Sequence, residues 1–121
     1  MYDWLNTYLL QHPAVTQAYK SAWKMEVFLI GGKIFAEIGE DKHGSPILTV
    51  KLEPAFSELL RAQYPAWIVP GYYSNKVHWS SLSLQGNVPD DTVRTMVDNA
   101  YSIVRAALPR KVQTELPPID T

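Results

Sequence analysis

The chain lacks cysteine, and this absence excludes disulfides, Cys-ligated zinc, iron–sulfur clusters and thiol catalysis. It suits a reducing compartment, so we expect a cytoplasmic protein. Long apolar runs are also missing, because charged residues, Pro or Gly interrupt each one well before the roughly 18 residues that a membrane helix needs. The first residues show neither a basic n-region nor an apolar h-region. We therefore expect no signal peptide and no membrane partner.

A large excess of charge of one sign is absent too. The chain has 11 Lys and Arg against 12 Asp and Glu, a formal net charge of −1. Proteins dedicated to nucleic acid are usually strongly basic, so any site for a polyanion has to be local. The remaining composition, 46% hydrophobic and 19% charged residues, is that of an ordinary globular protein. We expect one domain over residues 1–109 and a frayed tail over residues 110–121.

Three stretches carry clear strand signals. Gly31 and Gly32 separate two β-prone runs, and their freedom to adopt positive φ predicts a tight hairpin over residues 26–38. Apolar alternation predicts another strand over residues 47–52. A further strand is predicted over residues 79–84, where imperfect alternation indicates either a bulge or cover on both faces.

Three helices complete the expected fold. A short amphipathic stretch ends at His12-Pro13, a second helix runs over residues 54–64, and a third runs from residue 90 to residue 108 with apolar residues at helical spacing. The order of helix, strands, helix, strands and helix predicts an α+β fold of two layers: an antiparallel sheet with helices packed on one face. The other face of the sheet is then free.

Generic catalytic and metal-binding motifs are missing. His12, His43 and His78 do not have the spacing of metal ligands, and no GxSxG, Walker or GxGxxG pattern occurs. His12 and His43 are interpreted as solvated loop residues, and the acidic pair at residues 90–91 as serving the helix dipole. We expect no catalytic residue, no metal and no cofactor. An enzyme acting on a phosphorylated or acidic ligand would need His78 in a pocket beside another acid or base.

The distribution of charge along the chain is more informative. No acidic residue occurs between Glu58 and Asp90, and none between Asp3 and Glu26, whereas cations and aromatic residues occur in both stretches. Two such stretches on one surface would attract phosphate, while aromatic rings would offer stacking surface to bases.

Eight residues follow as candidates for binding nucleic acid. Three lysines would engage phosphates, Asn75 and His78 would donate hydrogen bonds, and the aromatic residues would form the apolar or stacking part. The candidates are Lys24, Lys51, Tyr72, Tyr73, Asn75, Lys76, His78 and Trp79.

An alternative is a protein–protein adaptor, or self-association, through the same aromatic surface, because Tyr and Trp suit protein interfaces equally well. Acidic residues decide between the two. If Glu26, Glu37 or Glu53 lies beside the three lysines and cancels their charge, the adaptor becomes the better interpretation.

The chain also resembles the MmcQ/YjbR family of small bacterial proteins over residues 3–109. The most specific part is an Asn-Lys-x-His-Trp segment followed by Leu-x-Gly-x-x-Pro. The matching segments are Trp23-Lys24, Lys33-Ile34-Phe35-Ala36, Val50-Lys51-Leu52, residues 54–60, Pro70-Gly71, Asn75-Lys76, His78-Trp79, residues 84–89, Asp98-Asn99-Ala100-Tyr101 and Leu108-Pro109.

This resemblance implies a frataxin-like (CyaY-like) α+β fold and a "double-wing" surface that binds DNA. It does not imply iron binding, since the chain lacks the acidic ridge associated with frataxins. The expected partner is therefore DNA, bound weakly and in a salt-sensitive way, with a protein or a second copy of the chain as the alternative.

Overall fold

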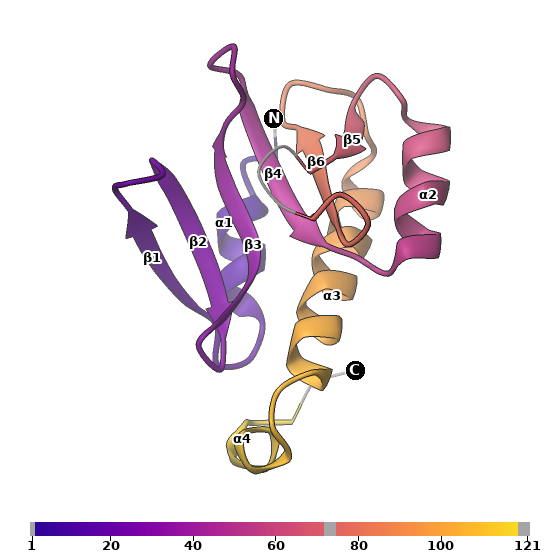
Figure 1. Ribbon diagram of the computed structural model, residues 1–121. Coiled ribbons are helices and arrows are strands. Elements are labelled where there is room, and N and C mark those ends of the chain that lie inside the picture. Colours follow the sequence, from indigo (N-terminus) through magenta and orange to yellow (C-terminus); the bar gives the residue numbers. More distant parts are fainter. Residues whose placement is uncertain (1, 72–74, 119–121) are drawn as a thin grey trace.

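The computed structural model describes residues 2–71 and 75–118 and shows a six-stranded sheet with helices packed against one face (Figure 1). The strands lie in the order β1-β2-β3-β4-β6-β5, and every neighbouring pair is antiparallel. The strands are β1 (Thr16–Lys20), β2 (Met25–Ile30), β3 (Lys33–Glu40), β4 (Pro46–Lys51), β5 (Ile68–Pro70) and β6 (Trp79–Ser83). The helices are α1 (Leu5–Gln11), α2 (Pro54–Gln63), α3 (Asp90–Ala106) and α4 (Arg110–Glu115).

The core lies between the helices and one face of the sheet, which confirms the expected α+β fold. Helix α3 packs across β2, β3 and β4, and its apolar stripe from Val93 to Val104 is buried. Helices α1 and α2 add Leu9 and Leu60 to the same cluster. The largest buried side chain is Tyr101, whose ring meets that of Phe35 edge-on. No helix in the described part of the chain is long and apolar enough to cross a membrane.

The opposite face of the sheet carries no helix and is called the open face. Because residues paired across antiparallel strands share a face, the register places Glu37, Thr49 and Ser81 in one row and Lys51 and Trp79 in the next. Val27 pairs with Glu37 and belongs to the same face; it is fully buried but lies outside the core cluster. The open face is therefore partly apolar at its centre and polar around it.

Two strands were not predicted from the sequence. Strand β1 forms the edge of the sheet, and all five of its residues are exposed, so it has no buried face to give an alternating pattern. Strand β5 has only three residues. In β6, Ser80, Ser81 and Leu82 are all buried and pair with β4 without a register shift. Cover on both faces, rather than a bulge, explains the imperfect alternation there.

The frayed tail expected from residue 110 onward is wrong for residues 110–115, which form α4. The sequence predicts only three helices. It does not indicate α4, because a helix of six residues is too short to show a periodic apolar stripe. Helix α4 is held by Val112 and Leu116, which pack against the core. A Cβ atom added to Gly31 would lie 2.6 Å from Leu108 Cδ1 and 3.3 Å from Val112 Cγ1, so the β2–β3 turn sits directly against the junction of α3 and α4.

This contact predicts different effects for the two turn glycines. Both have positive φ, +58° at Gly31 and +80° at Gly32, so alanine at either position should cost about 1 kcal/mol of stability through backbone strain. Gly31→Ala should cost about 1 kcal/mol more, at the lower end of overpacking penalties, because the end of the Leu108 side chain can shift. Urea unfolding of both variants measures the difference, and Gly32→Ala is the matched control because nothing lies within 4 Å of its added Cβ. Equal losses would contradict the contact.

Candidate nucleic-acid interface

The loop that joins β5 to β6, of which residues 71 and 75–78 are described, is fixed from below by Arg61 of α2. The guanidinium donates from Nε and Nη2 to Ser80 Oγ at 3.1 and 2.9 Å, and from Nη2 to the carbonyl oxygens of Lys76 and Trp79 at 2.7 and 2.9 Å. Ser80 is fully buried and also donates to Ser57 Oγ on α2. One side chain thus ties a helix, a strand and a loop together.

Two of the candidate residues help to build this loop. Asn75 Oδ1 accepts a hydrogen bond from the Val77 amide at 2.9 Å, and the Asn75 carbonyl accepts one from the Trp79 amide. Lys76 Nζ donates to the Gly71 carbonyl at 3.1 Å, which leaves two of its three N–H bonds for another acceptor. Asn75 is therefore first a turn-forming residue, while Lys76 is both structural and available.

Sheet pairing brings several of the candidate residues to one end of the sheet. Lys51 is the last residue of β4 and lies opposite Trp79, the first residue of β6. The exposed His78 is next to Trp79, and its carbonyl accepts from the Leu52 amide at 2.7 Å. Lys76 lies in the β5–β6 loop, three residues before Trp79, and so is close to the same end of the sheet.

Lys33 lies at the same end of the sheet, although sequence analysis did not select it. It pairs with the buried Ile30, so its side chain leaves the helix-bearing face rather than the face of Lys51 and Trp79. Val50 pairs with Ala36, so Lys51 is level with residue 35 and the start of β3 lies beside the end of β4. Only the register of these two strands could have shown this, because the two lysines are far apart in the chain. The group of Lys33, Lys51, Lys76, His78 and Trp79 is called the basic sheet end.

Lys24 lies at the other end of the sheet. It follows β1 in a tight turn with φ of +55°, level with the start of β4, so about 20 Å separates it from Lys51. Tyr19 and Trp23, which are 58% and 57% exposed, lie in the same region. The three lysines proposed from sequence therefore do not form one patch. Tyr72 and Tyr73 lie outside the described residues.

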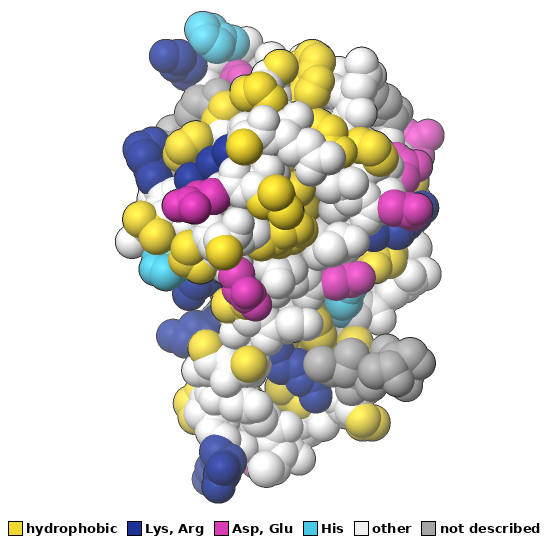
Figure 2. All heavy atoms as spheres, turned by 90° about the vertical axis from the view of Figure 1, so that its right-hand side faces the viewer, with side chains coloured by type: hydrophobic (Ala, Val, Ile, Leu, Met, Phe, Trp, Pro, Cys, Tyr) yellow, Lys and Arg dark blue, Asp and Glu magenta, His cyan; other side chains and the backbone are white. Residues whose placement is uncertain are grey.

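Among the described residues, no acidic side chain lies within ion-pair distance of the lysines of the basic sheet end; ion pairs instead join His12 to Asp98 and Arg94 to Asp91. Glu37 is nevertheless the diagonal neighbour of Lys51 on the open face, and Glu53 follows Lys51 by two residues. Glu26 lies on the helix-bearing face and accepts a hydrogen bond from Gln17. In Figure 2 most Lys and Arg side chains follow the left margin and the lower part of the view, whereas Asp and Glu lie in the middle, on the right and also beside the Lys and Arg side chains at the upper left.

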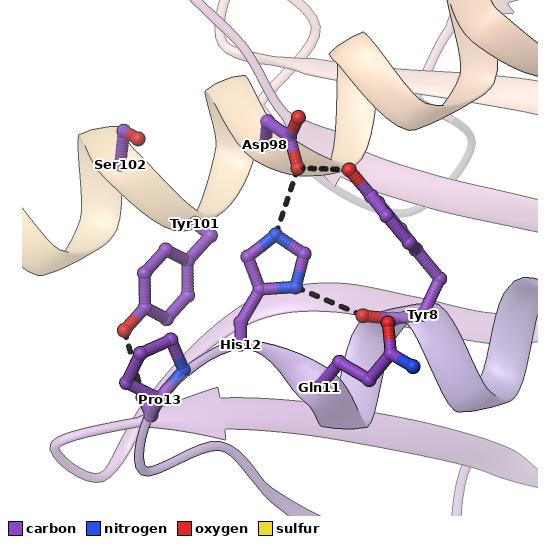
Figure 3. Close-up of a pocket in the computed structure, with 7 residues that line it drawn as sticks. All are labelled: Tyr8, Gln11, His12, Pro13, Asp98, Tyr101 and Ser102. Atoms are coloured by element: carbon purple, nitrogen blue, oxygen red, sulfur yellow. Dashed lines mark hydrogen bonds and ion pairs between the residues drawn. The ribbon is translucent and has the colours of Figure 1, made fainter. Parts of the chain in front are cut away.

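A pocket of about 370 Å³ lies on the helix side of the molecule, between α1 and α3 (Figure 3). Here His12, interpreted from sequence as a solvated loop residue, has a side chain only 13% exposed. Its Nε2 lies 2.8 Å from Asp98 Oδ1 and its Nδ1 2.9 Å from the Tyr8 carbonyl. Tyr8 Oη donates to the same carboxylate oxygen at 2.7 Å. The interpretation failed because the partner of His12 is 86 residues away in the chain.

This network joins the end of α1 to α3. Nε2 and Nδ1 of His12 both lie within hydrogen-bond distance of an oxygen atom, so the ring is held from both sides. Among the described residues, no group of three or more His, Asp and Glu side chains could hold a metal ion.

Tyr8 should make the protein less stable at alkaline pH. Burial, together with the hydrogen bond to Asp98 and its charge, raises the pKa of Tyr8 to about 12, whereas tyrosine in unfolded chains titrates near 10. The stabilising contribution is complete below pH ~10 and is lost as the pH rises from about 10 to about 12. Urea unfolding across this range should show a decline that Tyr8→Phe reduces. Burial also raises the pKa of Tyr2, so part of the decline in stability should remain in Tyr8→Phe. If Tyr8→Phe lost stability over this pH range as much as the unaltered protein does, Tyr8 would not be its cause.

The chain is similar to known proteins in both sequence and structure. The family model described as YjbR matches residues 10–103. The Escherichia coli proteins named "Uncharacterized protein YjbR" and "Uncharacterized protein YbdF" are each 30% identical, over 86% and 90% of this chain and 86% and 88% of their own lengths. The crystal structure of Deinococcus radiodurans protein DR2400 superposes with a TM-score of 0.82 at 24% identity, covering 92% of this chain and 83% of that one. A Pseudomonas syringae protein shares the fold at a TM-score of 0.63 and 16% identity, covering 74% of this chain and 86% of that one.

Proposed function

We propose that this chain, which belongs to the YjbR family, is a non-enzymatic, cytoplasmic domain that binds DNA through its basic sheet end. The observation that carries the proposal is the position of Lys51 directly opposite Trp79, with Lys76 on the loop that leads into β6 and no ion pair to these lysines among the described residues. Amines held by strand ends and a braced loop present a pre-formed set of phosphate contacts, and loops on rigid scaffolds are where binding groups concentrate.

The strength of binding follows from the number of cations. Three lysines and one neighbouring group neutralise about four phosphates, so the affinity should fall roughly 150-fold between 50 and 200 mM salt. The net charge of −1 adds no long-range attraction. Binding is therefore weak at cellular salt unless two copies of the chain act together.

Fluorescence anisotropy with labelled single- and double-stranded DNA at 50 mM salt tests the proposal. Lys51→Gln should weaken binding roughly three- to tenfold and lower the salt dependence by about one phosphate. Lys24→Gln is the matched control, because it makes the same change of charge at the opposite end of the sheet. Equal effects of the two variants, or no binding by the unaltered protein, would refute the interface.

A second candidate function is association through β1. This strand is the free edge of the sheet, and exposed Tyr19 and Trp23 lie at its end, so an added protein strand could continue the sheet there. The partner that we propose is a second copy of the chain. Salt separates the two functions, because an apolar edge contact should lose little affinity over the range that abolishes phosphate binding.

A further inference from the structure

Glu37 lies in the middle of the open face without a partner. It pairs with Val27 on one side and with Thr49 on the other. Its side chain is half-buried, and no hydrogen bond or ion pair joins it to any described residue. A carboxylate removed from water without a donor is costly, because its lost hydration is not replaced.

The neighbouring hydroxyls do not compensate for this loss. Thr49 Oγ1 and Ser81 Oγ lie 2.8 Å apart and hydrogen-bond to each other, and both residues are buried. These two hydroxyls form a buried polar surface beside Glu37. In agreement with this environment, burial raises the pKa of the Glu37 carboxyl. Glu37 therefore presents an acceptor that no donor among the described residues occupies.

The register also gives the distance from Glu37 to the aromatic part of the basic sheet end. Trp79 lies two strands away and two residues further along, so its Cα is about 12 Å from that of Glu37. Lys51 lies between them on β4. Because the Trp and Glu side chains both extend from the same face, a purine resting against Trp79 can direct one edge at the carboxylate.

We infer that the open face binds an unpaired guanine of single-stranded DNA, stacked on Trp79, with its N1–H and N2–H donated to Glu37 and a neighbouring phosphate at Lys51. This inference rests on the proposed function and specifies its ligand. Guanine is the base whose Watson–Crick edge offers two adjacent donors, which match the two oxygens of a carboxylate. Cytosine and adenine place an acceptor beside their amino group, and thymine flanks its single donor with two acceptors. Duplex DNA cannot present this edge, because pairing occupies it.

The test uses labelled 15-mers of thymidine whose central base is T, G, inosine, A or C, in anisotropy titrations at 50 mM salt. We expect the central guanine to bind roughly tenfold tighter than thymine, in line with the value of a bidentate contact. Inosine, which lacks the N2 amino group, should lose most of that gain. Glu37→Gln should abolish the guanine preference, while the affinity for the all-thymidine oligomer should not fall, because the substitution removes a negative charge beside Lys51.

Each outcome has a distinct meaning. If all oligomers bind equally, or Glu37→Gln keeps the guanine preference, the inference is wrong while the proposed function stands. If no oligomer binds, both fail. Thermal unfolding of Glu37→Gln checks its fold, and Glu37→Leu serves as a second variant; neither should be destabilised, since both remove an unpartnered half-buried carboxylate.

Discussion

Replacing Arg61 by lysine is expected to lower the free energy of unfolding by roughly 2–3 kcal/mol, although the charge is retained. A lysine amine cannot reproduce the fork that reaches Ser80 Oγ and the carbonyls of Lys76 and Trp79 together. The buried Ser80 hydroxyl would keep only Ser57 as a partner, and each buried group left without a bond costs about 1–3 kcal/mol. Urea unfolding measures the loss.

The same variant should loosen the loop that carries Lys76. The amides of Gly71 and Trp79, which bond to Trp79 and Asn75 carbonyls, should exchange hydrogen faster in Arg61→Lys, and affinity for DNA should fall with them. Arg94→Lys is the control, because Arg94 pairs with an Asp91 side chain that is 96% exposed and its guanidinium carbon lies 4.5 Å from the centre of the Trp4 ring. Each of these exposed contacts contributes at most about 1 kcal/mol. A loss no larger than that of the control would show that Arg61 does not brace the loop.

A helix or strand can be predicted from this sequence when it has a buried face, which gives a periodic apolar pattern, and an end marked by Gly or Pro. The hairpin over residues 26–38 and helix α3 meet both conditions, so glycine placement and helical spacing predict them. Strand β1 has no buried residue, and α4 spans less than two turns, so neither leaves a periodic trace. Their positions depend on contacts with β2 and with the α3–α4 junction, which no local pattern encodes.

The sequence predicts only those residues of the candidate site that are close together in the chain or lie on paired strands that the sequence also predicts. Lys76, His78 and Trp79 lie within four residues of the chain, and Lys51 ends the strand that pairs with β6, so all four come to the same end of the sheet. The absence of acidic residues around Lys24 in the sequence makes it as strong a candidate as Lys51 and Lys76. That criterion does not take account of distances across the sheet. Lys33 and Glu37 acquire their places from strand register alone, which is why the sequence did not indicate a role for Lys33 and suggested for Glu37 only a possible cancelling charge.

The segment of residues 98–101 that resembles the YjbR family is architectural. Asp98 holds Tyr8 and His12 of the α1 region, and Asn99 Oδ1 accepts the Glu53 amide where β4 leads into α2. Ala100 is fully buried. Each residue of this turn of α3 thus fixes a different part of the chain, and Asp98 also lines the pocket in Figure 3.

Tyr101 provides the largest of these contributions. Its hydroxyl donates to the Pro13 carbonyl at 2.7 Å and accepts from Arg105 Nη1 at 2.8 Å, while its ring is 1% exposed. Tyr101→Ala should therefore cost roughly 3–5 kcal/mol through the cavity left by the ring. Tyr101→Phe, which removes only the hydroxyl, should cost roughly 1–3 kcal/mol. Urea unfolding gives both values.

The control for the hydroxyl is Tyr19→Phe, because Tyr19 is 58% exposed and surface changes of this kind usually stay within about 0.5 kcal/mol. DNA affinity provides a second readout. Tyr101 lies on the helix side of the sheet, so the folded Tyr101→Phe variant should bind DNA as the unaltered protein does, in contrast to Lys51→Gln. Weakened binding by a stably folded Tyr101→Phe would place the ligand on the helix side and overturn the assignment of the interface to the open face, whereas unchanged stability would show that the Pro13 contact does not anchor the α1–β1 connection.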